Sequence, residues 1–200
     1  MRSFSPSGGG VRILRGKWRG RAIPFPGSPH TRPLSERARE GLFNSLEART
    51  TLVGKTVIDL FAGSGAIGLE FLSRGAAFCT FVEKDPQVLA HLRRLTEAWG
   101  LTAQSRLVQN DVLAFLRGSV QPADFIFIGA PYRYWQRKTI LQLLRERGWL
   151  KPGGYTILEH PLYESYDEWD GFVHKARYLS GCLSVFTGYL HGPSSHPRAS

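Results

Sequence analysis

Between residues 56 and 160, short apolar runs alternate with amphipathic segments in which apolar residues recur three and four positions apart. Runs of about four to eight apolar residues are typical of strands buried on both faces of a parallel sheet, and the amphipathic segments are typical of helices that cover it. The pattern therefore predicts an α/β domain built from repeated strand–helix units with short links. Strands are expected at 56–62, 79–85, 105–111, 124–132 and 155–160, and helices at 69–75, 86–100, 112–118 and 139–150.

The two ends of the chain follow different patterns. Residues 11–23 mix apolar and basic residues and predict a strand or hairpin, and a helical stripe of apolar residues then runs from Ser35, a suitable N-cap, to Leu46. Residues 172–190 predict two further strands with a turn near Ser180, which brings the mostly parallel sheet to seven strands. We expect a disordered tail at 1–10, a basic strand or hairpin and a helix within 11–50, one core domain at 51–190 and a frayed tail at 191–200.

Charge is distributed unevenly along the 200 residues. The net charge is +10, and the first 50 residues carry ten Lys or Arg against three Glu. The basic residues there are interleaved with Trp18 and glycines, a composition that favours binding of a polyanion such as nucleic acid through its phosphates. The alternative is a solvated face that only keeps the protein soluble. We adopt the nucleic-acid interpretation as the working hypothesis.

Cysteine, histidine and hydropathy patterns narrow the class of protein. Cys79 and Cys182 lie in apolar, strand-like segments without metal-ligand spacing, so we expect buried free thiols in a reducing, cytoplasmic compartment. The six histidines show no metal-ligand spacing either, so no metal site is predicted. No apolar run approaches the roughly 20 residues of a membrane span, and residues 1–10 lack the apolar stretch of a secretory signal. A cytoplasmic monomer without membrane contact is expected.

A glycine-rich turn separates the first predicted core strand from the helix that follows it. Gly63, Gly65 and Gly68 fit the spacing GxGxxG, in which glycines permit a tight turn and let a ligand approach the amides at the helix N-terminus. This spacing is typical of a Rossmann-like nucleotide site, but enzymes that use nicotinamide or flavin share it. The turn alone therefore leaves the cofactor undecided.

Acidic residues at the ends of successive strands narrow the choice of cofactor. Asp59 lies four residues before Gly63, where a carboxylate would repel a pyrophosphate but suits a ligand with sulfonium and ammonium groups. Glu83 ends the second strand and can accept hydrogen bonds from ribose hydroxyls, and Asn110-Asp111 ends the third, where an adenine amino group can bind. Each acid alone can equally be a turn cap. Together they outline one crevice, and we predict S-adenosylmethionine in preference to a dinucleotide.

Three longer segments carry specific motifs: GKWRGR at 16–21, TRPLSERAREGLFNSL at 31–46 and DLFAGSGAIGLEFLSRGA at 59–76. With them the chain resembles, over nearly its whole length, the bacterial methyltransferases that modify guanine N2 in small-subunit (16S) ribosomal RNA. The resemblance implies the class I methyltransferase form of the Rossmann-like fold, S-adenosylmethionine as cofactor, and ribosomal RNA or an assembling ribosomal particle as partner. The cofactor-binding residues expected from it are Asp59, Phe61, Gly63, Ser64, Gly65, Gly68, Glu83, Lys84, Asp111 and Val112.

The end of the fourth core strand departs from that family. Gly129-Ala130-Pro131-Tyr132 stands where the family has Asp-Pro-Pro followed by Tyr or Phe. An exocyclic guanine amine gains positive charge as it attacks a methyl group, so a preorganised acceptor aimed at its protons stabilises the transition state. Gly129 has no side chain, which leaves backbone carbonyls such as that of Ala130, and losing one such contact typically costs about 10²–10³ in rate. The resemblance places catalysis at Gly129, Ala130, Pro131 and Tyr132, with Tyr132 stacking on the target base.

Side chains outside this crevice are open to more than one interpretation. Arg39 aligns with a family helix near the substrate mouth, but surface charge with pairs inside the helix explains it equally well. Glu159 and His160 are the nearest candidates in the sequence to replace the missing carboxylate, and no pattern places either of them at the site. The RNA-binding residues expected are Arg15, Lys17, Trp18, Arg19, Arg21, Arg32 and Arg133.

The sequence thus predicts an S-adenosylmethionine-dependent enzyme that methylates N2 of a guanine in small-subunit ribosomal RNA. The GAPY segment sustains an alternative, a catalytically impaired homologue that binds cofactor and RNA, because one fold can host both functions. A nicotinamide oxidoreductase is a third interpretation, which binding of NAD(H) would reveal.

Overall fold

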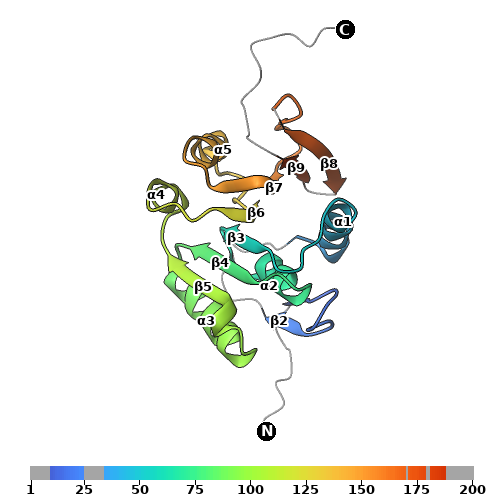
Figure 1. Ribbon diagram of the computed structural model, residues 1–200, viewed down its shortest axis with the longest axis vertical. Helices are drawn as coiled ribbons and strands as arrows, with labels where there is room; N and C mark the ends of the chain where they lie inside the picture. Colours follow the sequence, from blue (N-terminus) through green and yellow to red (C-terminus); the bar gives the residue numbers. More distant parts are fainter. Residues whose placement is uncertain (1–9, 25–33, 170, 179–180, 188–200) are drawn as a thin grey trace.

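The computed structural model of the protein describes residues 10–24, 34–169, 171–178 and 181–187. At its centre is a seven-stranded sheet of β3 (Thr56–Leu60), β4 (Phe78–Glu83), β5 (Ser105–Gln109), β6 (Ala123–Ile128), β7 (Leu150–His160), β8 (Phe172–Tyr178) and β9 (Gly181–Thr187). The strand order is β5-β4-β3-β6-β7-β9-β8 (Figure 1). Neighbours from β5 to β7 pair in parallel, whereas β9 pairs antiparallel with both β7 and β8. The predicted mostly parallel seven-stranded sheet is therefore confirmed.

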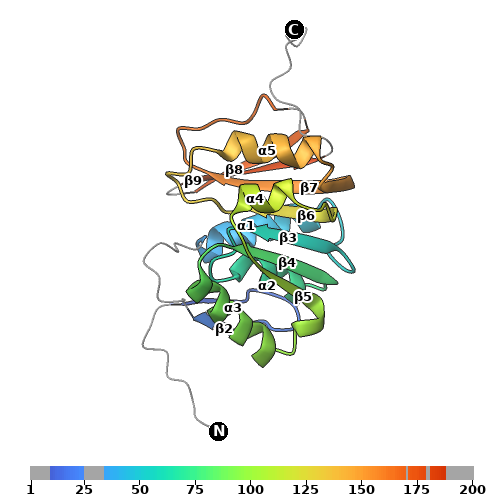
Figure 2. The same ribbon diagram turned by 90° about the vertical axis from the view of Figure 1, so that its left-hand side faces the viewer.

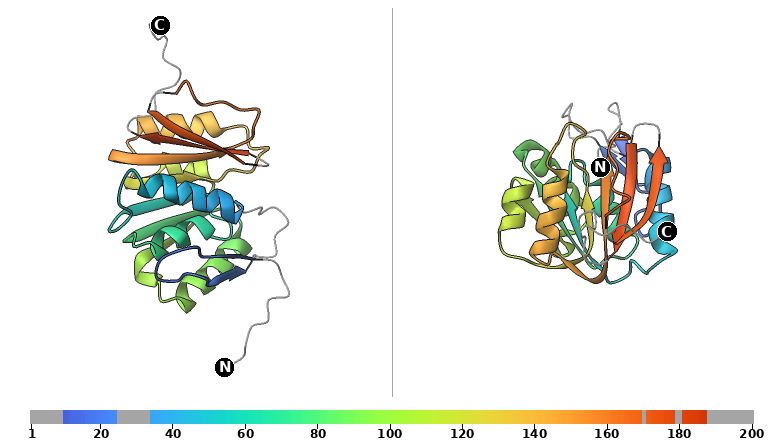
Figure 3. Two further views of the ribbon diagram at one scale, coloured as in Figure 1. Left: turned by 90° about the vertical axis from the view of Figure 1, so that its right-hand side faces the viewer. Right: turned by 90° about the horizontal axis from the view of Figure 1, so that it is seen from above.

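Helices cover both faces of this sheet. One apolar core joins the sheet to α1 (Glu36–Glu47), α2 (Ala66–Ser73) and α3 (Pro86–Ala98), and a second joins it to α4 (Val112–Arg117) and α5 (Arg137–Glu146). Seen from above, α1 lies on one side of the strands and α4 and α5 lie on the other (Figure 3). Val57 enters the first core and its neighbour Ile58 enters the second. Because each strand is covered on both faces, its apolar run is continuous.

The element boundaries differ most from the prediction between α5 and β7. The predicted helix continued to residue 150 because Trp149 and Leu150 extend its apolar pattern. Instead Gly148, at φ 70°, ends the helical segment, and Leu150 already belongs to β7. A short 3₁₀ helix at Thr102–Gln104 was not predicted. The start of α1 is as expected, because the Ser35 hydroxyl accepts a hydrogen bond from the amide of Ala38 at 3.2 Å.

A small antiparallel sheet of β1 (Gly10–Arg12) and β2 (Ala22–Pro24) precedes α1. It lies beside α3, whose His91 ring contacts the Pro24 carbonyl at 2.9 Å (Figure 2). Where the sequence predicts a basic strand or hairpin, the structure has these two short paired strands, and residues 10–24 are called the basic hairpin below. Gly10, which the prediction assigned to the tail, is the first residue of β1. Residues 1–9 and 188–200 lie outside the described residues, so the disordered and frayed tails stay predictions.

The two cysteines are buried free thiols, as expected. Burial raises the pKa of Cys79 well above its ordinary value, and the charge of Asp59 adds to the rise. Within the described residues, no helix combines the length and the apolar character that crossing a membrane requires.

Candidate active site

The turn between β3 and α2 is tight and strained. Gly63 and Gly65 adopt positive φ angles of 53° and 76°, and Gly65 is the left-handed N-cap of α2. Phe61 is the one non-glycine residue with positive φ in the described chain, at 62°. A Cβ atom on Gly68 would lie 2.2 Å from Cε1 of Phe81, so α2 can approach β4 this closely because residue 68 is glycine. The glycines thus form the tight turn that the spacing predicts, and Gly68 in addition permits close packing of α2 on β4.

Asp59 lies beneath this turn with 2% of its surface exposed. Its carboxylate accepts a hydrogen bond from the amide of Gly68 at 3.0 Å. Burial raises the pKa of Asp59 to about 8; the Gly68 amide lowers it, and the charge of Glu83 raises it further. A cationic ligand above the turn would favour the ionised form of this carboxylate.

Glu83 joins the glycine turn to the link that follows β4. Its Oε2 accepts a hydrogen bond from the amide of Gly63, and its Oε1 accepts one from the amide of Asp85, each at 3.0 Å. The backbone carbonyl of Glu83 accepts a hydrogen bond from the amide of Asn110 at 3.2 Å. The ends of β3, β4 and β5 therefore meet at one edge of the sheet, as the sequence predicted.

Asp111 is the N-cap of α4. Its Oδ1 accepts hydrogen bonds from the amides of Leu113 at 2.9 Å and Ala114 at 3.2 Å, which is the structural role that had been the alternative to adenine binding. Because Oδ1 accepts both of these bonds, Oδ2 of the same carboxylate takes part in neither of them. Among the other predicted cofactor residues, Ser64 and Val112 are buried and Lys84 is exposed.

The segment 129–132 lies beside the glycine turn. The amide of Gly129 donates to the carbonyl of Leu60 at 3.2 Å, at the end of β3. The ring of Phe61 meets that of Tyr134 edge to face, with centroids 5.0 Å apart. The end of β3 and the residues that follow β6 are thus in direct contact, through Leu60 with Gly129 and through Phe61 with Tyr134.

Arg137, which was not among the predicted site residues, organises this segment. Its guanidinium is buried and donates to the carbonyls of Ala130, Pro131 and Tyr134, and it forms an ion pair with Glu164 at 3.0 Å. The one available signal was a cation at the first residue of a helix, where the helix dipole disfavours positive charge. The Ala130 carbonyl, predicted as an acceptor for the substrate amine, therefore already accepts one hydrogen bond, at 3.3 Å, and one lone pair remains.

Tyr132 is half-buried, and its hydroxyl is tied to β7 and β8. It donates to Oε1 of Glu159 at 3.3 Å, and the hydroxyl of Tyr178 donates to the same oxygen at 2.8 Å. Burial raises the pKa of Glu159, and these two hydrogen bonds oppose the rise. His160, the other candidate, is buried against the Ser184 hydroxyl at 2.9 Å. Glu159 therefore forms a hydrogen bond with Tyr132, a predicted catalytic residue, whereas the side chain of His160 is buried in the core.

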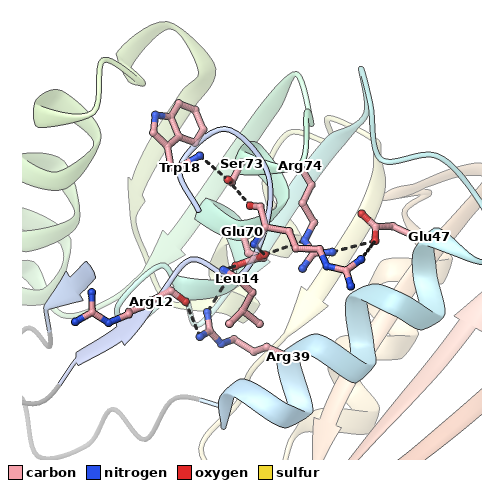
Figure 4. Close-up of polar contacts among 9 residues, drawn as sticks. Arg12, Leu14, Trp18, Arg39, Glu47, Glu70, Ser73 and Arg74 are labelled. Atoms are coloured by element: carbon pink, nitrogen blue, oxygen red, sulfur yellow. Dashed lines mark hydrogen bonds and ion pairs between the residues drawn. The ribbon is translucent and has the colours of Figure 1, made fainter. Parts of the chain in front are cut away.

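A fully buried carboxylate, that of Glu70 in α2, anchors the basic hairpin (Figure 4). It accepts hydrogen bonds from the amide of Leu14 at 2.8 Å, the amide of Arg15 at 3.0 Å and Nε of Arg74 at 2.8 Å. Arg39 lies 3.9 Å from the same carboxylate and is also fully buried. The interpretation of Arg39 as surface charge is therefore wrong, because a hairpin far away in sequence covers that face of α1.

The tip of the hairpin lies at the end of α2 remote from the glycine turn. The amides of Lys17 and Trp18 donate to the carbonyl and the hydroxyl of Ser73, the last residue of α2. An eight-residue helix is about 12 Å long, so the length of α2 separates this tip from the glycine turn. Trp18 is half-buried against Trp99, with ring centroids 6.2 Å apart. Among the predicted RNA contacts, Arg15, Lys17, Arg19 and Arg21 are exposed near this tip, Arg133 is exposed beside the active-site segment, and Arg32 lies outside the described residues.

Comparison with known proteins identifies the family. The family model described as "Conserved hypothetical protein 95" matches residues 11–182. The chain belongs to this family. It is 39% identical over 151 residues to Ribosomal RNA small subunit methyltransferase D of Escherichia coli strain K12, covering 75% of each chain. It is 35% identical over 154 residues to the protein of the same name from Haemophilus influenzae, covering 76% of this chain and 79% of that one.

A solved structure supports the fold of this family member. The chain resembles a T. thermophilus 16S rRNA N2 methyltransferase (RsmC) in complex with AdoMet and guanosine, with a TM-score of 0.65 and 23% identity. The match covers 89% of this chain and 49% of the other. The predicted Rossmann-like methyltransferase fold is thereby confirmed.

Proposed function

We propose that this protein transfers a methyl group from S-adenosylmethionine to N2 of a guanine in small-subunit ribosomal RNA. The observation that carries the proposal is the 39% identity to a relative named as a ribosomal RNA small subunit methyltransferase. The catalytically impaired alternative gains no support from the relatives, since both are named methyltransferases.

The residues at the carboxyl edge fit S-adenosylmethionine better than a dinucleotide. Asp59 is a buried carboxyl group beneath the turn, and a nearby cation would stabilise its ionised form, whereas a pyrophosphate would oppose ionisation. We assign the methionine end to Asp59 and the turn at 63–68, and the ribose to Glu83. Oδ2 of Asp111, with the backbone of Val112, is assigned to the adenine. When bound, the cofactor supplies an electrophilic methyl group on its sulfonium. Among the described residues, no cluster of three His, Cys, Asp or Glu could hold a metal ion.

The 129–132 segment is proposed to hold the guanine. Arg137 holds the Ala130 carbonyl in place, so the remaining lone pair is a preorganised acceptor for the amine protons. Glu159 orients Tyr132 through its hydroxyl, which restrains the ring proposed to stack on the base. Proximity of the held amine to the methyl group then accounts for much of the acceleration.

Methyl transfer from labelled S-adenosylmethionine to small-subunit ribosomal RNA, or to particles lacking the modification, tests the proposal. Nucleoside mapping is expected to find the label in N2-methylguanosine. Absence of label, with cofactor binding confirmed by calorimetry, would overturn the enzymatic function. Glu83→Ala is expected to weaken cofactor binding, and unchanged affinity with full turnover would contradict the site assignment.

The variant Gly129→Asp measures how much a carboxylate at this position would raise kcat. A Cβ at this position would lie 2.9 Å from Cε1 of Phe127, a ring edge that must shift by a few tenths of an ångström. We expect kcat to rise by up to about 10²–10³, the range typical of one preorganised polar contact. Gly129→Ala, which meets the same ring without adding an acceptor, is the matched control. An unchanged kcat in Gly129→Asp would show that backbone acceptors suffice.

A further inference from the structure

Two aromatic side chains next to the active-site segment are almost fully exposed. Trp135, on the loop between β6 and α5, is 82% exposed, and Tyr163, on the loop after β7, is 81% exposed. Leu162 beside Tyr163 is also exposed. Burying large aromatic surface is strongly favourable, so exposed aromatic side chains beside a functional site indicate a surface that a partner covers.

The two loops are braced against each other. The hydroxyl of Tyr163 donates to the backbone carbonyl of Tyr132 at 3.4 Å. The ion pair between Arg137 and Glu164 joins the same two loops at 3.0 Å. Trp135 and Tyr163 therefore stand on a supported surface that includes the residue proposed to stack on the target base.

The charge around these aromatics suits a polyanion. Arg133 is exposed, and no ion pair of Arg133 occurs within the described part of the chain. Of the acids on the second loop, Glu164 pairs with Arg137 and Asp167 with Lys175, whereas Glu168 is exposed and forms no ion pair within the described part of the chain. Unpaired RNA presents base faces and phosphates together, which matches aromatic rings beside a free cation.

We propose that Trp135 and Tyr163 form a stacking platform for unpaired bases that flank the target guanine, with Arg133 on an adjacent phosphate. The proposal rests on the RNA substrate proposed above. A guanine withdrawn from its helix leaves its neighbours without stacking partners, and exposed rings beside the site would replace that stacking. A protein partner is the other class of occupant, and the experiment below separates the two.

The test measures binding of a single-stranded RNA oligonucleotide with a central guanine, by fluorescence anisotropy at several salt concentrations. Trp135→Ala and Tyr163→Ala are each expected to weaken binding by about fivefold or more, the effect of losing one base–aromatic stack. The dependence of affinity on salt is expected to stay unchanged, because no phosphate contact is removed. Arg133→Ala, in contrast, is expected to reduce the slope of log K against log salt by about 0.7.

Two controls isolate the rings. Val53→Ala removes an exposed apolar side chain from the link between α1 and β3, and it is expected to leave RNA binding unchanged. Tyr163→Phe keeps the ring and removes the hydrogen bond to Tyr132, so it is expected to bind like the unmodified protein. Equal losses in Tyr163→Phe and Tyr163→Ala would assign Tyr163 to bracing and overturn its role in the platform.

Normal RNA binding by Trp135→Ala and Tyr163→Ala would overturn the proposal. Loss of binding to assembled small-subunit particles in that case would identify a protein partner. The readout needs no methyl transfer, so its failure is distinct from failure of the proposed enzyme. An inactive protein whose RNA binding still depends on both rings would refute the enzyme and retain the platform.

Discussion

Replacing Glu70 with alanine is expected to detach the basic hairpin and strongly destabilise the protein. The change removes a fully buried carboxylate that accepts hydrogen bonds from two hairpin amides and from Nε of Arg74. It also leaves Arg39, fully buried, without the one carboxylate within 4 Å in the described structure. Burial already lowers the pKa of Arg39, against the opposing charge of Glu70, so desolvation of this cation is costly.

Breaking a buried ion pair by removing one partner typically costs about 3–5 kcal/mol. Two circumstances place Glu70→Ala within that range. Arg74 keeps its contact with Glu47 at 2.9 Å, which limits the loss. The two unpaired hairpin amides add to it. For a protein of this size the corresponding fall in Tm is about 6–20 °C.

Urea denaturation followed by circular dichroism measures the free energy of unfolding, and limited trypsin digestion reports release of the hairpin at its Arg and Lys residues. Glu47→Ala is the matched control, because Glu47 also pairs with Arg74 but is 36% exposed; it is expected to cost at most about 1 kcal/mol. A loss in Glu70→Ala no larger than that of the control, with unchanged trypsin resistance, would refute this account of how the hairpin is held.

Three further variants test glycine packing and the buried carboxyl group of Asp59. Gly68→Ala is expected to cost about 1–3 kcal/mol, because the new methyl group would overlap two buried side chains of β4. Gly41→Ala in α1 has open space around it and is expected to stabilise the protein by about 0.5–1 kcal/mol. Asp59 has its pKa raised from 3.8 to about 8, so the folded state retains a proton that the unfolded state loses between these pH values. Stability therefore falls as pH rises through this window, by up to about 1.4 kcal/mol per pH unit, and Asp59→Asn is expected to flatten that dependence.

Denaturant midpoints at fixed pH compare the stabilities of Gly68→Ala and Gly41→Ala. Equal stabilities for these two variants would contradict the packing argument. A pH series of unfolding free energies decides the prediction for Asp59→Asn. If the protein and Asp59→Asn show parallel dependence on pH between 4 and 8, Asp59 is ionised in the folded state.

The sheet, its helices and the glycine turn could be predicted because their signals are local. Apolar period and glycine spacing each depend on a few neighbouring residues, and the Ser35 cap follows from the residue type at a helix start. The end of α5 was misplaced for the same reason: Trp149 continues the apolar pattern of the helix but reaches the core after the turn at Gly148.

Side-chain partners distant in sequence could not be predicted. Arg39 is buried because Glu70 and the hairpin meet on its face of α1, and no periodicity of α1 shows this. Tyr178 reaches Glu159 and Tyr132 only after β7 and β8 take their places, and the ion pair of Arg137 with Glu164 likewise requires the loop after β7. The sequence therefore predicts which strand ends carry the candidate site, and the structure adds the side chains that support those strand ends.

The attachment of the hairpin also bears on the order in which the chain folds. Residues 14–18 are made early in synthesis, but their partners Glu70 and Ser73 follow 55 or more residues later. During translation the hairpin therefore lacks its contacts with Glu70 and Ser73 until α2 has left the ribosome. Removal of a terminal segment is often harmless, but deleting the chain through residue 21 would remove the two amides that donate to the buried carboxylate of Glu70.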